Sequence, residues 1–115
     1  MARKISIANN LTNTTKVTAY TVPVKNSALW QLLYIVNTDG NNNVSVWWYD
    51  SSANTEFYIL GGKNMVSGDY IKFDGSDVVL QENDEIRYQL GSSGAVTFIS
   101  TLELVPNQAT QFHGG

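Results

Sequence analysis

Cysteine is absent from this 115-residue chain, and there is a single histidine, His113. The lack of cysteine excludes disulfides, thiol nucleophiles and cysteine-ligated metals. His113 lies in a polar C-terminal stretch that has little to pack against. A hydrolase triad or a zinc site needs convergent partners held by a scaffold, which such a stretch would not supply. The sequence therefore predicts no catalytic residue, no cofactor and no metal ligand.

Charge is also scarce, because Asp, Glu, Lys and Arg make up 15% of the residues and the net charge is -3. Ordinary globular domains carry about 25% charged residues. An acidic chain has no basic footprint for nucleic acid, and it would not be drawn to an anionic membrane. No apolar run approaches the ~20 residues of a membrane span, and no apolar stretch of a secretory signal follows Arg3 and Lys4. We expect neither a nucleic-acid nor a membrane partner.

Short apolar segments separated by turn-forming residues are what the chain does contain. They are spaced every 8–12 residues, as in sandwiches, and none shows the i, i+3, i+4, i+7 period of a helix. The pattern predicts one all-β, antiparallel two-sheet β-sandwich of about eight or nine strands, with jelly-roll and immunoglobulin-like topologies both open. The predicted strands span residues 16–22, 29–37, 44–50, 56–60, 69–73, 78–80, 85–90 and 95–105. Residues 1–15 form an N-terminal arm or edge strand, 16–105 the sandwich and 106–115 a polar tail.

Residues 27–50 contain two apolar runs and, between them, the most turn-rich segment of the chain, NTDGNNN. Asp39-Gly40 is a strong hairpin signal, so we predict a long β-hairpin at the centre of the sandwich. Three asparagines should lengthen its loop into an exposed tip. The first run is apolar on both faces, with Trp30 and Tyr34 on one and Leu33 on the other. It therefore predicts a central strand that is covered on both sides.

The sequence Trp47-Trp48-Tyr49 is the most distinctive residue pattern. Adjacent strand residues face opposite sides, so Trp48 should share the inner face of Val44 and Val46, while Trp47 points outward. Three interpretations stay open: core packing, a subunit interface, where aromatics are enriched, and a sugar-stacking platform. The candidate interface residues are Trp47, Tyr49, Asn41, Asn42 and Asn43.

Acidic residues gather between positions 69 and 85 and raise the possibility of a calcium site. Calcium requires several oxygens that converge from one or two loops, and the loops at 74–77 and 81–85 could supply them. EF-hand spacing is absent, however. Asp and Asn are common in turns because they tolerate turn dihedral angles, and this simpler explanation is favoured. The acidic residues concerned are Asp69, Asp74, Asp77, Glu82, Asp84 and Glu85.

Several strand-and-turn motifs between Val17 and Val105 resemble small β-sandwich virion proteins of tailed bacteriophages, of the capsid decoration (cement) type. The motifs are Thr21-Val22-Pro23, Asn37-Thr38, the strand from Val44 to Ser52, Gly61-Gly62-Lys63 and the segment from Val78 to Arg87. The resemblance covers about three quarters of the chain and brings no catalytic residues with it. The Trp47-Trp48 pair and the Asn41–Asn43 insertion depart from the pattern.

The resemblance implies a non-enzymatic structural protein that bridges capsid subunits on the surface of a virion. Its partners would be the major capsid protein or other virion proteins, and it would form a homo-oligomer such as a trimer. Two alternatives remain: a structural protein of the neck, tail or a fibre, and a carbohydrate-binding module that uses surface aromatics.

Overall fold

The computed structural model describes residues 2–75 and 77–107, and this part of the chain is all β. Its nine strands are β1 (Arg3–Leu11), β2 (Val17–Thr21), β3 (Asn26–Asp39), β4 (Asn42–Asp50), β5 (Thr55–Met65), β6 (Tyr70–Phe73), β7 (Val78–Leu80), β8 (Glu85–Leu90) and β9 (Ala95–Pro106). They form two antiparallel sheets. Sheet A has the order β1-β9-β3-β6, with β7 also paired to β3, and sheet B has the order β2-β8-β4-β5. The predicted antiparallel β-sandwich is confirmed.

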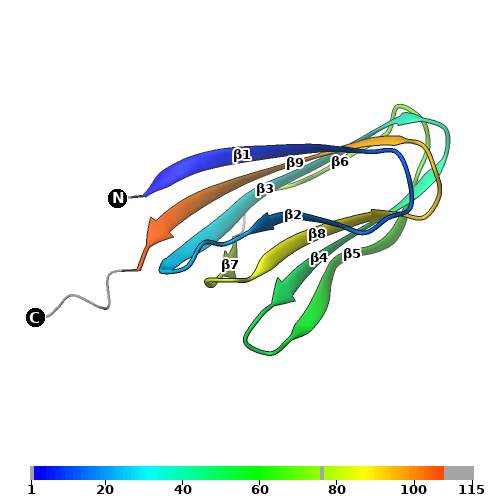
Figure 1. Ribbon diagram of the computed structural model, residues 1–115. Coiled ribbons are helices and arrows are strands. Elements are labelled where there is room, and N and C mark those ends of the chain that lie inside the picture. Colours follow the sequence, from blue (N-terminus) through cyan, green and yellow to red (C-terminus); the bar gives the residue numbers. More distant parts are fainter. Residues whose placement is uncertain (1, 76, 108–115) are drawn as a thin grey trace, which may run out of the picture.

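The strand pairings are nested, as in one long hairpin that has been rolled up (Figure 1). β1 pairs with β9, β2 with β8, β3 with β6 and β7, and β4 with β5. Rolling this hairpin adds the contacts of β9 with β3 and of β8 with β4. Because β6 and β7 share one position in the order, the arrangement is an eight-position jelly roll. Residues 3–11 are its edge strand, paired to β9 along their whole length.

The predicted hairpin of residues 27–50 is wrong, because β3 lies in sheet A and β4 in sheet B. The loop between them is also short, since only Gly40 and Asn41 separate the strands. Asp74-Gly75 likewise connects β6 and β7, which both pair with β3. A turn sequence reverses the chain locally, but long-range packing selects the hydrogen-bonding partner. Among the described residues, β4 and β5 are the one pair of consecutive strands that bond to each other.

A β-bulge changes the predicted faces of β3. The register to β9 shifts between Trp30 and Leu32, which leaves Gln31 without a partner opposite. Ala28 and Trp30 therefore point inward before the bulge, while Leu33 and Ile35 do so after it. Strand β3 is central, as predicted, but the described residues cover one of its faces alone, because they form two layers.

Strand β5 continues through Gly61-Gly62 to Met65, although the sequence pattern predicted that it ends at residue 60. A second β-bulge lies at these glycines. Val46 pairs with Leu60 and Val44 with Lys63, so Ser45 alone lies opposite both glycines. Gly62 has a φ of 63°, a left-handed conformation that glycine adopts without strain. Its N–H donates to Ser45 Oγ at 2.9 Å. The two glycines therefore bend the strand and do not terminate it.

Tyr88 of β8 joins the two sheets in the centre of the core. It is fully buried, and its ring stacks on Phe98 of β9 with 4.3 Å between centroids. Its hydroxyl shares a short hydrogen bond with Ser100, which is buried as well. Burial raises the pKa of Tyr88 to about 12, although the Ser100 hydrogen bond opposes that rise. A buried phenol of this kind keeps its proton and its partner.

Candidate functional site

The two adjacent tryptophans of β4 face opposite sides of sheet B, as predicted. Trp48 packs against the core, next to the buried Val44 and Val46. Trp47 pairs with Arg87 of β8 and Tyr58 of β5 on the outer face of the sheet. Facing outward does not expose it, however. Its indole is 6% exposed, which favours packing over an open contact surface among the three interpretations of Trp47.

Two side chains cover Trp47. The Tyr58 ring lies 5.1 Å away, centroid to centroid, and is itself 65% exposed. The Lys16 ammonium sits 4.0 Å from the indole centroid, within the range of a cation–π contact. The outer surface at this point is therefore presented by Tyr58 and Lys16, and Trp47 forms the layer beneath them.

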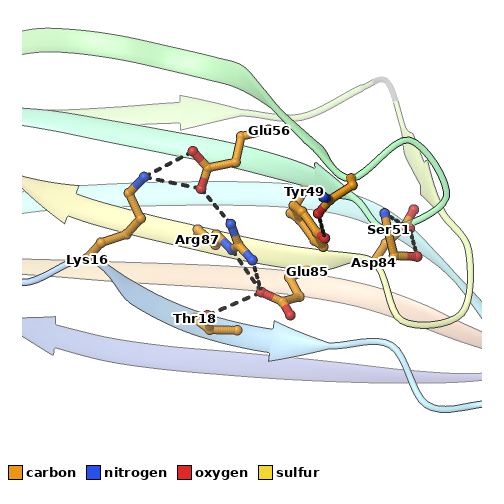
Figure 2. A network of polar contacts seen from close by, with 9 residues as sticks. Lys16, Thr18, Tyr49, Ser51, Glu56, Asp84, Glu85 and Arg87 are labelled. Carbon is orange, nitrogen blue, oxygen red and sulfur yellow. Dashed lines mark hydrogen bonds and ion pairs between the residues drawn. The ribbon is translucent and has the colours of Figure 1, made fainter.

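A network of alternating charges continues across this face (Figure 2). Glu56 of β5 accepts hydrogen bonds from Lys16 at 3.0 Å and from Arg87 at 2.7 Å. Arg87 also binds Glu85 at 2.7 Å, and its guanidinium lies 4.0 Å from the Tyr49 ring centroid. Burial alone would raise the pKa of Glu56, but the bonds from Arg87 and Lys16 lower it below its usual value. On the outer face these contacts join strands β8, β4 and β5 to one another and to Lys16, which directly precedes β2.

The sugar-stacking platform of Trp47 and Tyr49, one of the three interpretations, is not open in this arrangement. Tyr49 lies half-buried beneath Arg87, and its hydroxyl is bonded to Asn54 at 2.5 Å. Stacking on a sugar requires a free ring face, and a neighbouring side chain lies over each of these two rings. The sequence did not predict the Glu56–Arg87 network. The outward alternation of Glu85 and Arg87 was a signal for it, but the partner Glu56 is distant in sequence.

The three asparagines at the β3–β4 connection have different environments. Asn41 and Asn43 are exposed, whereas Asn42 is 4% exposed, which corrects the prediction that all three form an exposed tip. Asn42 donates to the Ser92 carbonyl at 3.0 Å, and its amide oxygen accepts from the Ser92 N–H. Asn43 is bonded to Asn64. These amides line an open hollow at one end of the sandwich, together with Met65, Val66 and Gly91.

Asp84 is the buried member of the acidic group, with 1% of its surface exposed. Its carboxylate accepts four hydrogen bonds: from the Gln81 N–H, the Ser51 N–H, the Ser51 hydroxyl and the Trp48 indole. Burial would raise the pKa of Asp84, but these bonds together lower it. Figure 2 shows its contact with Ser51. The carboxylate therefore joins the turn that follows β4 to the turn that precedes β8.

The other acids do not converge on Asp84. Glu82 accepts from the Lys25 N–H at 2.8 Å, Asp74 lies 3.4 Å from Lys72, and Glu85 is paired with Arg87. Among residues 2–75 and 77–107, no three His, Cys, Asp or Glu side chains come close enough to hold a metal ion. His113 and most of the predicted tail lie outside the described residues.

A small apolar pocket opens near the edge where β6 and β7 succeed each other along β3. Its volume is about 50 Å³, and its lining includes Trp30, Ile59 and Phe73. The indole N–H of Trp30 is buried and has no acceptor among the described residues. The described chain contains no helix long and apolar enough to cross a membrane.

Comparisons with known proteins reveal the fold and no sequence family. No family model matches the chain, and no curated protein matches it either. Solved structures do match. A chain in the acid-stable capsid of Helicobacter pylori bacteriophage KHP30 aligns with a TM-score of 0.59 and 12% identity, over 93% of this chain and 95% of that one.

Two other matches come from outside viruses. A chain of Bacillus endospore appendages, described as disulfide-linked pili, gives a TM-score of 0.55 and 14% identity, over 93% of this chain and 89% of that one. The Drosophila NLP core, described in relation to pentamer formation and histone binding, gives a TM-score of 0.53 and 10% identity, over 92% of this chain and 100% of that one. The fold thus resembles those of capsid and pilus proteins, and such low identities establish the fold alone.

Proposed function

We propose that this chain is a non-enzymatic structural protein of a bacteriophage virion, and specifically a capsid decoration protein. It would bind the outer surface of the head and bridge neighbouring major capsid subunits. The observation that carries the proposal is the match to the KHP30 capsid chain, which extends over nearly the whole length of both chains. The two jelly rolls are therefore of similar size, so the likeness does not come from one domain of a much larger shell protein.

The pilus match suggests a filament subunit as the competing structural role. Those pili are described as disulfide-linked, and this chain has no cysteine with which to form such a link. The motifs from Val44 to Ser52 and from Val78 to Arg87 resemble phage virion proteins. Together these points favour the virion.

Heating purified empty heads with and without the protein tests the decoration role. A decoration protein links subunits that must separate when the head disrupts, so bound copies should raise the disruption temperature. A calorimetric scan of both samples measures the difference. Equal disruption temperatures with the protein bound would contradict a stabilising role, and failure to bind heads would contradict decoration altogether.

Electron microscopy of labelled virions separates this role from one in the neck, tail or a fibre. Label distributed over the head supports decoration, while label confined to the tail supports the alternative. Sedimentation of the purified protein tests the expected homo-oligomer and distinguishes a trimer from other assemblies.

A further inference from the structure

The outer face of sheet A bears a continuous apolar ridge. Its members alternate with the buried residues of the same strands and come from β3, β9, β6 and β7. They are Leu29, Leu32, Tyr34, Val36, Ile99, Tyr70 and Val79. Tyr70 is 61% exposed and Val79 49% exposed, and the Tyr34 and Tyr70 rings pack edge to face at 5.8 Å. No described residue forms a third layer over this ridge.

The ridge accounts for the apolar sequence of β3. A strand that is apolar on both faces is typical of a sheet covered on both sides. The sandwich covers the face that carries Trp30, Leu33 and Ile35, and leaves the face of Tyr34 and Val36 open. Open apolar surface of this kind marks sites of protein association. We propose that the outer face of sheet A pairs with the same face of a second copy of this chain.

The contour of the face fits its own copy. One half, formed by β3, β6 and β7, carries six of the seven ridge side chains. The other half, formed by β1 and β9, carries the seventh, Ile99, and small side chains around it, which include Ser6, Ala8 and Thr101. Ser6 and Thr101 are bonded to each other at 3.0 Å, which keeps this half low. A two-fold axis parallel to the strands, between β9 and β3, sets the high half of each copy against the low half of the other.

The strand register places particular residues opposite one another in such a pair. Ala8, Ile99, Tyr34 and Lys72 lie in one cross-strand row. The two-fold axis therefore brings Tyr34 of each copy to Ile99 of the other. Two sheets that pack face to face stay nearly aligned, at about -30° and ~10 Å apart. Close opposition is therefore expected in the central rows.

Charge and area favour a second copy as the occupant. The charged residues of this face lie at its margins: Lys4 at one corner, Glu103 at the same end bonded to Gln31, and Lys72 on the edge strand beside Asp74. An apolar centre with a polar margin is the usual anatomy of an interface. Four strands of this length give a face of roughly 19 by 35 Å, or about 650 Å², close to the ~800 Å² per partner of stable interfaces.

Sedimentation equilibrium of the full chain tests the pairing without any capsid present, so its outcome is separate from that of the decoration proposal. We expect a species of twice the 12.7 kDa chain mass that dissociates on dilution. Tyr70→Lys and Ile99→Lys should each give a monomer. Tyr58→Lys is the matched control, because Tyr58 is an equally exposed tyrosine on sheet B, and this variant should still pair. Circular dichroism confirms that each variant is folded.

Thiol labelling locates the contact, because the chain has no cysteine of its own. Thr101→Cys lies on the proposed contact face and Gln89→Cys on the outer face of sheet B; both positions are half-buried. At a concentration where about nine chains in ten are paired, maleimide should label Thr101→Cys about tenfold more slowly than it does in a dilute, monomeric sample. Gln89→Cys should be labelled at the same rate in both samples.

Four outcomes would overturn the proposal. They are a single-chain mass at every concentration, a three-chain assembly, pairing that survives both lysine substitutions, and protection of Thr101→Cys that does not depend on concentration. The last would mean that the chain covers this face itself.

Discussion

The outer faces of the two sheets present their aromatic side chains in opposite ways. On sheet B, Trp47 points outward but is 6% exposed, because Tyr58 and Lys16 cover it. On sheet A, Tyr70 points outward and remains 61% exposed. Both residues alternate with core positions on their strands. Alternation therefore establishes which side of a sheet a residue occupies, while the neighbouring strands decide whether it is covered.

The difference lies in what surrounds each aromatic. On sheet B, Glu56 binds both Lys16 and Arg87, and those cations in turn cover Trp47 and Tyr49. Charged side chains of both signs from the same chain thus cover the aromatic rings on the outer face of sheet B. The charged neighbours of the ridge of sheet A lie at its margins, where Lys72 is paired with Asp74 and Glu103 is bonded to Gln31, so the apolar centre can be buried by another protein surface. Sheet B is closed by its own chain, and sheet A is the candidate contact face.

Trp47→Ala should produce the largest effect if sheet B is closed as described. Truncating a buried tryptophan typically costs about 3–5 kcal/mol of folding free energy. The inner-face position of Trp48 would suggest a larger loss for Trp48→Ala, but Trp47 is the more buried of the two rings, so we expect the larger loss for Trp47→Ala. Urea unfolding of both variants measures the two losses. A loss of folding free energy below about 1 kcal/mol for Trp47→Ala would mean that Tyr58 and Lys16 do not pack tightly on the indole.

Asp84→Asn should lower stability by about 2–3 kcal/mol, since hydrogen bonds to a charged group are lost and an amide NH₂ now meets N–H donors. The folded carboxyl has a lowered pKa. Its contribution is therefore present above the usual pKa of an aspartate and is lost as pH falls through the folded value. Unfolding midpoints across the acid range should fall less steeply in the variant. Asp77→Asn, at an exposed position, is the control and should behave like the original chain.

Tyr88 provides an alkaline test that involves neither outer face. Its folded pKa of about 12 exceeds the ordinary 10.0. The folded state therefore holds the phenol proton more strongly, and this stability is present below pH ~10 and lost as pH rises toward ~12, by about 2–3 kcal/mol. Tyr88→Phe removes this titration and should show a shallower alkaline loss. Identical alkaline profiles would contradict the burial of the phenol.

Glu56→Gln should cost about 1 kcal/mol, because two ion pairs of partly buried groups are lost. High salt should reduce the difference from the original chain, since it screens these charges. Asp74→Asn removes the more exposed Lys72–Asp74 pair on the sheet A edge, where both side chains are more than half exposed, and it should change stability very little. Equal losses for the two variants would remove the contrast between the faces.

Tyr70→Ser should have the smallest effect on folding, within about 0.5 kcal/mol when measured in dilute solution. Tyr58→Ser should cost more, because it uncovers Trp47. Both tyrosines are highly exposed, so exposure alone predicts equal losses. Thermal unfolding at low protein concentration compares them. A larger loss for Tyr70→Ser would mean that the ridge of sheet A supports the fold of the single chain.

The sequence predicted the strands best where one face alone is buried. Residues 85–90 alternate strictly, and the observed β8 has the predicted bounds and faces. Residues 29–37 were predicted as a strand with Trp30 and Tyr34 on the same face. The bulge at Gln31, which leaves no mark in the sequence pattern, places them on opposite faces. Of the candidate interface residues, Trp47 and Asn42 are buried, and the Glu56–Arg87 network was missed. The faces of residues 29–37, the burial of Trp47 and Asn42, and the Glu56–Arg87 network all depend on contacts between residues distant in sequence.

By itself, the sequence determined that this chain is an all-β sandwich, where most of its strands run and that Trp47 and Trp48 face opposite sides. Those properties follow from a period of two and from turn chemistry, which are local. Only the tertiary structure decided that β3 and β4 belong to different sheets, that the pairings nest into a jelly roll, and that Trp47 is covered while Tyr70 is open. Pairing and coverage depend on strands brought together by the burial of a shared core, and no local pattern encodes that choice.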